Sequence, residues 1–236
     1  MGCLVGNSVI NHLLYADDLV VLSPYSGGLQ QLLKICSTFG SEHDVIYNAK
    51  KSNVVIVRTR EDKHLSFLVF HLSGSCLSVC RETKYLGHIF TDDLRDDRDI
   101  SRQCRKLYAQ ANMLLRKFSM CSGPVKCALF KTFCTPMYTA FLWCSYTKGN
   151  MQRLRVAYND ALRILLKVPR WHSASDLFVS CGIHTFEALL RHSMYGFMCR
   201  LDESRNRIIE GLVSPTRSSY RFSSRLRKHW RDSLYL

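Results

Sequence analysis

Residues 10–22 read INHLLYADDLVVL and set two adjacent carboxylates, Asp17 and Asp18, between two apolar runs. Two apolar runs separated by a few polar residues are typical of a β-hairpin in which the polar residues form the turn. Aspartate is a common turn residue, which is one interpretation of the pair. The other is a divalent-metal site, because Mg²⁺ prefers carboxylate oxygens and two such ions can stabilise the oxygens of a phosphoryl displacement. The motif alone leaves both interpretations open.

The first 91 residues are predicted to form strands around one helix. Short runs rich in Val, Ile, Phe and Tyr alternate with Gly, Ser, Asn and Asp, a pattern that indicates strands. These runs cover residues 8–14, 19–22, 45–47, 53–57, 66–70, 76–80 and 84–90. Between them, Gly27 and Gly28 open a stretch with one apolar face at helical spacing, made by Leu29, Leu32, Leu33, Cys36 and Phe39.

The rest of the chain is predicted to be helical. Apolar residues recur at helical spacing in residues 99–118, 125–146, 151–167, 173–181 and 185–201. Pro136 should break the second of these helices, Ser173 and Thr185 are expected N-caps, and Gly182 is an expected stop. The acidic segment 92–99 is expected to be a linker. The predicted fold class is therefore α+β, with three parts: 1–91, a helical region 92–213 and a basic tail 214–236.

The positive charge of the chain is concentrated in its helical half. Residues 1–100 carry 10 basic and 12 acidic residues, whereas residues 101–236 carry 23 and 7. Such a surface attracts polyanions, most often nucleic acid and less often anionic lipid, although a solvated basic surface without a specific partner is the alternative. The expected contacts on the first basic helix are Arg102, Arg105, Lys106, Arg116 and Lys117. The tail combines an aromatic ring with several cations, which suits stacking and phosphate contact, although a disordered basic terminus is the alternative. Its residues of this kind are Arg221, Arg225, Arg227, Lys228, Trp230 and Arg231.

Composition excludes several classes of protein. The chain is 47% apolar and 22% charged, which is ordinary globular usage and excludes wholesale disorder. No apolar run approaches the roughly 18 residues of a membrane span, and the start lacks a secretory signal, so no membrane partner is expected. The 11 cysteines form no paired framework, which favours an intracellular location. No zinc is expected either, because apolar residues at helical spacing surround the nearest metal-like set, Cys181, His184, His192 and Cys199.

The Tyr-Ala-Asp-Asp motif and its surroundings resemble the reverse transcriptases of non-LTR (LINE-type) retrotransposons. The similarity covers residues 11–20 (NHLLYADDLV) and continues through residues 23–24 (SP), 28–30 (GLQ) and 32–33 (LL). Residues 48–52 (NAKKS) resemble the family's next motif, and residues 84–87 (KYLG) resemble the strand that grips the primer terminus. The resemblance continues weakly through the basic helices, at the position of the family's thumb.

This resemblance implies the C-terminal part of a palm, an antiparallel sheet with a helix, followed by a thumb-like helical region. The implied activity is RNA-directed DNA polymerisation by two-metal nucleotidyl transfer. Its cofactor would be Mg²⁺ held by Asp17 and Asp18, and its partners would be an RNA template, a DNA primer and deoxynucleoside triphosphates. Lys51 would serve as a phosphate contact or proton donor, the alternative being a solvated lysine at a strand edge. The implied nucleic-acid contacts are Tyr15, Ala16, Tyr85, Leu86 and Gly87.

Two of these contacts have alternatives within the fold. Tyr15 could equally be a core strand residue, and Gly87 could serve a bulge or tight bend rather than close approach to a nucleic acid strand.

The family's palm also supplies a third carboxylate, from a strand that precedes the hairpin and follows the fingers. Only 14 residues precede Tyr15, and none of them is acidic. The fingers and the first catalytic strand are therefore expected to be missing, and the chain is expected to be inactive as a polymerase by itself. Two alternatives are a non-catalytic nucleic-acid-binding module that uses the basic helices, and a helical interaction protein with an incidental hairpin.

Overall fold

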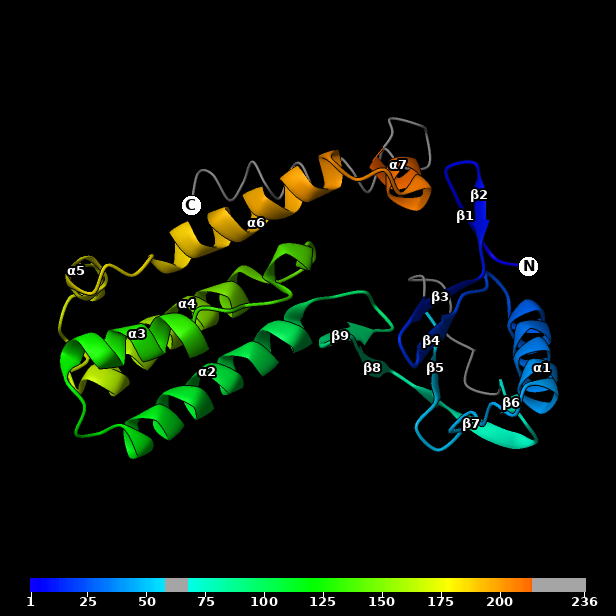
Figure 1. The fold of residues 1–236 in the computed structure, drawn as a ribbon, viewed down its shortest axis with the longest axis horizontal. Helices are drawn as coiled ribbons and strands as arrows, with labels where there is room; N and C mark the ends of the chain where they lie inside the picture. The colour runs from blue at the N-terminus through cyan, green and yellow to red at the C-terminus, as the bar shows by residue number, and fades with distance from the viewer. Residues whose placement is uncertain (58–67, 214–236) are drawn as a thin grey trace. The chain divides into compact units, whose positions relative to one another are not determined.

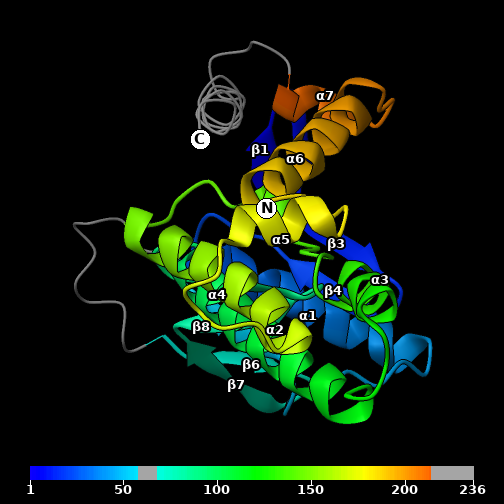
Figure 2. The same ribbon diagram turned by 90° about the vertical axis from the view of Figure 1, so that its left-hand side faces the viewer.

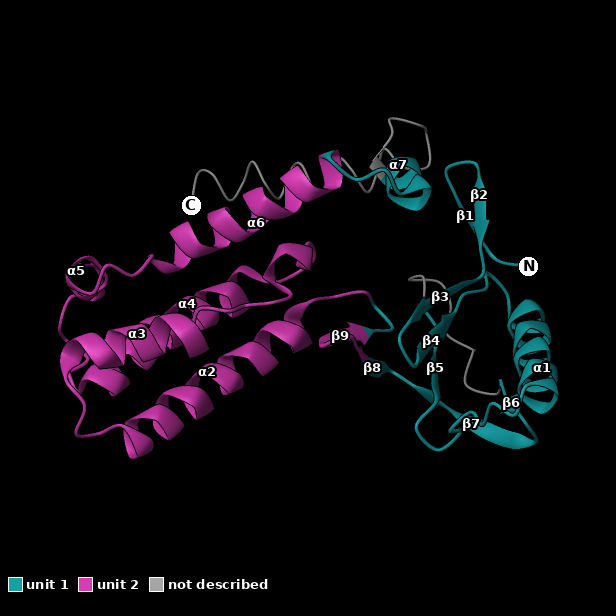
Figure 3. Ribbon diagram, in the orientation of Figure 1, with its two compact units in different colours: residues 1–83, 91–93, 203–225 teal, residues 84–90, 94–202, 226–236 magenta. Residues whose placement is uncertain are grey.

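The computed structural model describes residues 1–57 and 68–213, which form two compact units (Figure 1, Figure 3). Within the described residues, the first unit comprises residues 1–57, 68–83, 91–93 and 203–213, and the second comprises residues 84–90 and 94–202. Strands belong mainly to the first unit and helices mainly to the second, so the α+β prediction is confirmed. The predicted tail 214–236 and the start of the predicted strand 66–70 lie outside the described residues.

The first unit contains three small sheets. Two are antiparallel hairpins, β1 (Cys3–Val5) with β2 (Ser8–Ile10) and β3 (His12–Tyr15) with β4 (Asp18–Val21). The third has the order β5-β7-β6, made by β5 (Asn53–Val55), β6 (Phe70–Leu72) and β7 (Ser75–Cys80). In it β6 and β7 form a hairpin, and β7 pairs with β5 in parallel. The prediction of an antiparallel sheet is therefore wrong for this one pair.

Two helices accompany these sheets. Helix α1 (Ser26–Glu42) packs on β6, and the short helix α7 (Arg207–Val213) contacts β1. The small core beneath α1 consists of Leu33, Val54, Phe70, Leu72 and Leu77. Burial of this apolar face is what holds α1 on the sheet, because the helix has no side-chain N-cap and no charged residue that complements its dipole.

The strand predicted at residues 45–47 is wrong. The amide of Val45 donates to the carbonyl of Gly40 at 3.0 Å, so this segment folds back on the end of α1. A Cβ at Gly40 would lie 2.6 Å from the carbonyl oxygen of Val45, and only glycine permits this approach. The apolar pattern of the segment misleads, because Ile46 is almost fully exposed. The run at residues 8–14 likewise divides at Asn11 into two strands of different sheets.

The second unit is an assembly of helices. Its elements are α2 (Asp97–Lys117), α3 (Gly123–Phe133), the 3-10 helix η1 (Ala140–Leu142), α4 (Lys148–Leu166), α5 (Ala174–Ser180) and α6 (Phe186–Asp202). Helices α2 and α4 lie side by side in both views (Figure 1, Figure 2). Their facing side chains build a core that includes Leu107, Leu114, Leu154, Tyr158 and Leu162. Tyr158 stacks on Phe178 at 5.3 Å and meets Phe130 edge-on at the same distance, so aromatic contacts tie α3 and α5 to α4.

The predicted caps and stops are confirmed, but the helix predicted over residues 125–146 is wrong beyond Phe133, because Pro136 cannot continue the helical hydrogen bonds and only the 3-10 helix η1 follows in this segment. Ser173 accepts a hydrogen bond from the amide of Asp176, and Thr185 accepts one from the amide of Ala188, so both act as N-caps. Gly182 has a φ of 57°, which ends the turn after α5. Helix α3 stops at Phe133, before Pro136. No helix among the described residues has the length and apolarity needed to cross a bilayer.

Candidate metal and nucleic-acid site

The Tyr-Ala-Asp-Asp motif forms the turn of the β3–β4 hairpin. Tyr15 pairs with Asp18 across the strands, which leaves Ala16 and Asp17 as a two-residue turn. Hairpins of this length favour a positive φ at the first turn position, and Ala16 has a φ of 52°. All four side chains are exposed, Tyr15 to 64%, so Tyr15 is not a core residue. The sequence correctly predicts both the hairpin and the exposed position of the carboxylates.

Asp17 and Asp18 fit part of a magnesium site. Mg²⁺ is usually bound through one or two carboxylates, with waters and substrate phosphates completing its octahedron, and this pair supplies two hard oxygen donors. Within the described part of the chain, no cluster of three or more His, Cys, Asp or Glu side chains could hold a metal ion. The turn therefore offers two ligands and no third carboxylate from these residues.

Lys51 lies in a tight turn immediately before β5. Its amide donates to the backbone oxygen and to the side-chain oxygen of Asn48, both at 3.1 Å, and Ser52 donates to the Asn48 carbonyl through amide and hydroxyl. Asn48 is thus the residue that shapes this turn. The Lys51 side chain is exposed and lies in the turn rather than on the strand.

The other motif resembling the family, residues 84–87, forms a second hairpin turn. Strands β8 (Glu82–Tyr85) and β9 (His88–Thr91) are joined by Leu86 and Gly87, which have φ values of 44° and 83°. Two positive φ values are the signature of a type I′ turn. Gly87 therefore forms a tight bend, and its contact with a nucleic acid strand stays a prediction. The single predicted strand over residues 84–90 is two strands. Leu86 is 38% exposed at this turn.

His88 anchors the second hairpin to the helical unit. Its ring is buried between two carboxylates, with Nδ1 3.2 Å from Asp99 Oδ2 and Nε2 3.5 Å from Asp96 Oδ1. Burial alone would lower the pKa of His88, but the two carboxylates outweigh burial and raise it to about 9. His88 is therefore a cation at neutral pH.

Asp99 is the centre of this buried network. It is fully buried at the start of α2, and its carboxylate accepts hydrogen bonds from Arg102 at 2.8 Å, Thr139 at 2.8 Å and Trp143 at 2.9 Å. Burial opposes ionisation, but these donors together with His88 hold the pKa of Asp99 well below its usual range. Asp99 thus remains charged inside the fold.

The linker predicted at residues 92–99 is therefore wrong. Besides Asp99, Asp96 accepts from the amides of Cys144 and Ser145, and Asp97 accepts from Thr147 and Asn150. These carboxylates fasten the chain before α2 to the segment between α3 and α4. The missed signal is the spacing of Asp99, Gln103 and Leu107, which recur every four residues on the buried face of α2.

The cations predicted on α2 fall into two groups. Arg102 donates from two nitrogens to Asp99, so its charge is matched within the fold. The other four, Arg105, Lys106, Arg116 and Lys117, are exposed. At 100° per residue they occupy about a third of the helix circumference, on an arc that adjoins the buried face. None of the four pairs with an acidic side chain in the described residues, and we call them the α2 basic face.

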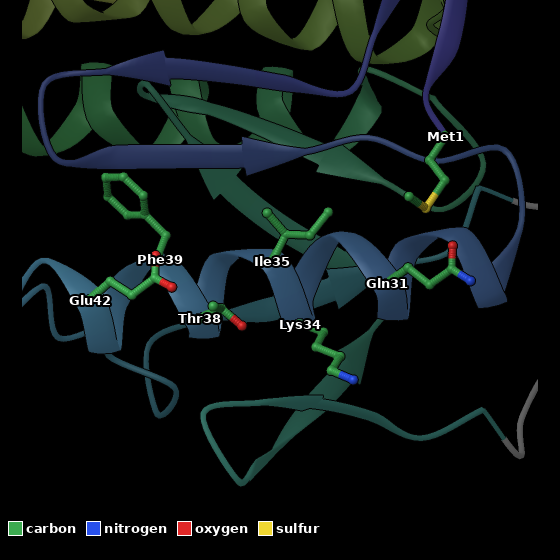
Figure 4. A pocket seen from close by; sticks show the side chains of 7 residues that line it. All are labelled: Met1, Gln31, Lys34, Ile35, Thr38, Phe39 and Glu42. Carbon is green, nitrogen blue, oxygen red and sulfur yellow. The ribbon is translucent and has the colours of Figure 1, made fainter.

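A hollow beside α1 contains none of these residues (Figure 4). Ile35 and Phe39 extend to the same side of the helix and are about half exposed. The remaining lining residues are Met1, Gln31, Lys34, Thr38 and Glu42. This surface is open and mainly apolar, and it lacks the convergent polar groups of an active site.

Comparisons with protein-family models, with curated proteins and with solved structures gave no match.

Proposed function

We propose that the chain is a segment of a LINE-type reverse transcriptase, comprising the C-terminal part of the palm and a thumb, and that it binds a primer–template duplex. The observation that carries the proposal is the pair of adjacent carboxylates, Asp17 and Asp18, on an exposed two-residue hairpin turn. A solvent-facing turn of this kind presents carboxylate oxygens to a metal ion without obstruction by the fold.

The chemistry follows from the donor set. Mg²⁺, when bound, neutralises the charge that develops on the attacking and leaving oxygens of nucleotidyl transfer. Asp17 and Asp18 would hold the metal, and the exposed ring of Tyr15 would lie beside the primer end. Lys51 would provide a mobile positive charge for nucleotide phosphates, since its side chain is exposed.

The apolar surface of β3 supports the palm assignment. Leu13 and Leu14 are successive strand residues and therefore point to opposite faces of the hairpin, yet they are 40% and 67% exposed. Leucine exposed on both faces of a strand is expected where a further part of the protein would pack on the sheet and bury these side chains. In the family, that layer includes the strand that carries the third carboxylate.

The α2 basic face supports duplex binding. From Arg105 to Lys117 it extends over roughly 18 Å at 1.5 Å per residue, a length that spans several phosphates of a duplex. The same observation favours a second candidate, a nucleic-acid-binding module without catalysis, since this surface needs no third carboxylate. Metal binding at the turn distinguishes the two candidates.

Paramagnetic broadening by Mn²⁺ tests the metal site. We expect the amide signals of Asp17 and Asp18 to broaden at millimolar Mn²⁺ and to recover when Mg²⁺ is added. Asp202 and Glu203 are a matched control, because they are also adjacent and exposed but lie at the C-terminal end of helix α6 rather than in a hairpin turn. Equal broadening at both pairs would contradict a metal site at the turn.

Primer extension on an RNA template tests the activity. We expect little or no synthesis by the chain alone, because two-metal catalysis depends on positioning, and no third carboxylate joins the pair within the described residues. Template-dependent synthesis that disappears in an Asp17→Asn variant would contradict this expectation. It would mean that another acid of the chain completes the site.

A further inference from the structure

Tyr138 is an exposed aromatic residue in an otherwise buried segment. It is 71% exposed, whereas its neighbours Met137, Thr139 and Ala140 are 6%, 3% and 4% exposed. Phe141 meets the ring edge-on, with the centroids 6.4 Å apart. A large ring held in water by a buried segment loses little conformational freedom when a ligand stacks on it.

This ring lies beside the turn that joins β8 and β9. A Cβ at Gly87 would be 4.0 Å from Cδ1 of Tyr138, so the ring reaches the bare backbone of the turn. Leu86 projects partly exposed from the same turn. The tyrosine ring thus lies next to the glycine backbone of the turn, and the exposed Leu86 is the neighbouring turn residue.

Asp99 fixes the turn and the Tyr138 segment relative to each other. On the hairpin side it accepts from the amide of Ile89 at 3.3 Å and contacts His88. On the other side it accepts from Thr139, the residue next to Tyr138. One buried carboxylate therefore connects the turn to the segment that carries the exposed ring.

We propose that Tyr138 contacts the nucleic acid strand held at the Leu86–Gly87 turn by stacking on one of its bases, and that Asp99 and Thr139 are positioning residues for this contact. This inference rests on the proposed function. Every base has a flat face, so a tyrosine ring can stack without reading sequence, as on other single-strand and primer-end platforms. An adjacent turn without a side chain at Gly87 leaves room for the backbone of the strand.

The test uses the full chain and a labelled RNA–DNA duplex with a recessed primer end, with binding followed by fluorescence anisotropy. We expect Tyr138→Ala to weaken binding about tenfold with no change in the salt dependence, because a stacked ring contacts no phosphate. Tyr138→Phe should stay within about twofold of the wild type, since the ring is retained. The matched control is Tyr195→Ala, which removes another exposed tyrosine of the same unit, on α6.

An abasic scan of the primer end locates the contact. We expect one abasic position to weaken binding by the wild type and to cause no further loss in Tyr138→Ala, since the stack is already absent. Thr139→Val, which removes the hydroxyl that Asp99 binds, should weaken wild-type binding but have no effect in the Tyr138→Ala background.

Wild-type affinity in Tyr138→Ala, or an abasic penalty that persists in this variant, would overturn the inference while leaving the proposed function intact. Absence of duplex binding by the wild type would overturn both.

Discussion

The carboxylate of Asp99 is fully buried and accepts hydrogen bonds from donors on α2, on β9 and near η1. Removal of its charge leaves Arg102 without its ionic partner and leaves His88 with Asp96 alone, in a region with little water. We expect Asp99→Asn to lower the free energy of unfolding by about 3–5 kcal/mol, as measured by urea denaturation. Asp202→Asn, at an exposed aspartate, should change it by less than about 0.5 kcal/mol. Equal effects of the two substitutions would mean that the network adds no stability.

His88 makes the stability of the helical unit sensitive to alkaline pH. Its pKa is raised from 6.5 to about 9 in the folded state, so the folded state binds the proton more tightly than the unfolded state. This contribution is complete below pH 6.5 and is lost as the pH rises through about 9, with a maximum of about 3 kcal/mol. We expect the unfolding midpoint in urea to fall over this interval.

The pH dependence should be absent from His88→Gln. His184→Gln, which replaces an exposed histidine of the same unit, should retain it. An unchanged profile in His88→Gln would contradict the assignment of the proton to His88.

At the scale of elements, the β3–β4 and β8–β9 turns each hold a residue other than glycine at a positive φ, namely Ala16 and Leu86. This backbone conformation is strained for residues with a side chain. Leu86 occupies the first position of a type I′ turn, where Asn, Asp or Gly avoids the clash of a left-handed backbone. We expect Leu86→Asn to raise the free energy of unfolding by roughly 1 kcal/mol. The same substitution should weaken duplex binding, because it removes the exposed apolar side chain of the turn proposed to contact nucleic acid.

The control for this prediction is Leu142→Asn, since Leu142 is similarly exposed at 41% and has no positive φ. It should leave stability unchanged or reduce it. A loss of stability in Leu86→Asn as large as that in the control would show that the turn carries no strain.

Elements whose apolar residues recur at a regular spacing were predictable from the sequence. Elements whose conformation depends on tertiary contacts were not. The apolar face of α2 and the caps Ser173 and Thr185 are local signals that the structure confirms. The segment 45–47 has strand composition, but its backbone bonds to the end of α1. Strand β1 and helix α7 are too short to show a period and were missed.

At the scale of the whole molecule, the described residues form two separate apolar cores. The core beneath α1 and the core between α2 and α4 share no residue. We expect Phe70→Ala to increase amide hydrogen exchange in α1 and β5–β7 and to leave α2 and α4 unchanged. Leu107→Ala should do the reverse. Equal changes in both units after either substitution would contradict two independent cores.

The candidate site was predictable only in part, for a related reason. The turn residues Asp17 and Asp18 follow from local sequence, because two apolar runs enclose them. The surface around Tyr138 does not, since Gly87 and Tyr138 are distant in sequence and are brought together by a buried carboxylate. From the sequence alone, Asp99 belongs to an acidic run that resembles a solvated linker. Only the structure shows the hydrogen-bond donors that surround it.

The α2 basic face gives the most direct test of nucleic-acid binding, through the slope of log affinity against log salt for an RNA–DNA duplex. We predict a steep negative slope for the wild type. It should become less steep by about 3.6 in a variant that replaces all four cations with glutamine, because each phosphate that the protein no longer neutralises reduces the slope by about 0.9. The four substitutions are Arg105→Gln, Lys106→Gln, Arg116→Gln and Lys117→Gln.

A control with the same net charge should keep most of the wild-type slope. It carries four substitutions of exposed cations outside α2, namely Lys131→Gln, Lys148→Gln, Arg205→Gln and Arg207→Gln. A slope that falls equally in both variants, or a wild type whose affinity does not depend on salt, would contradict duplex binding through the α2 basic face.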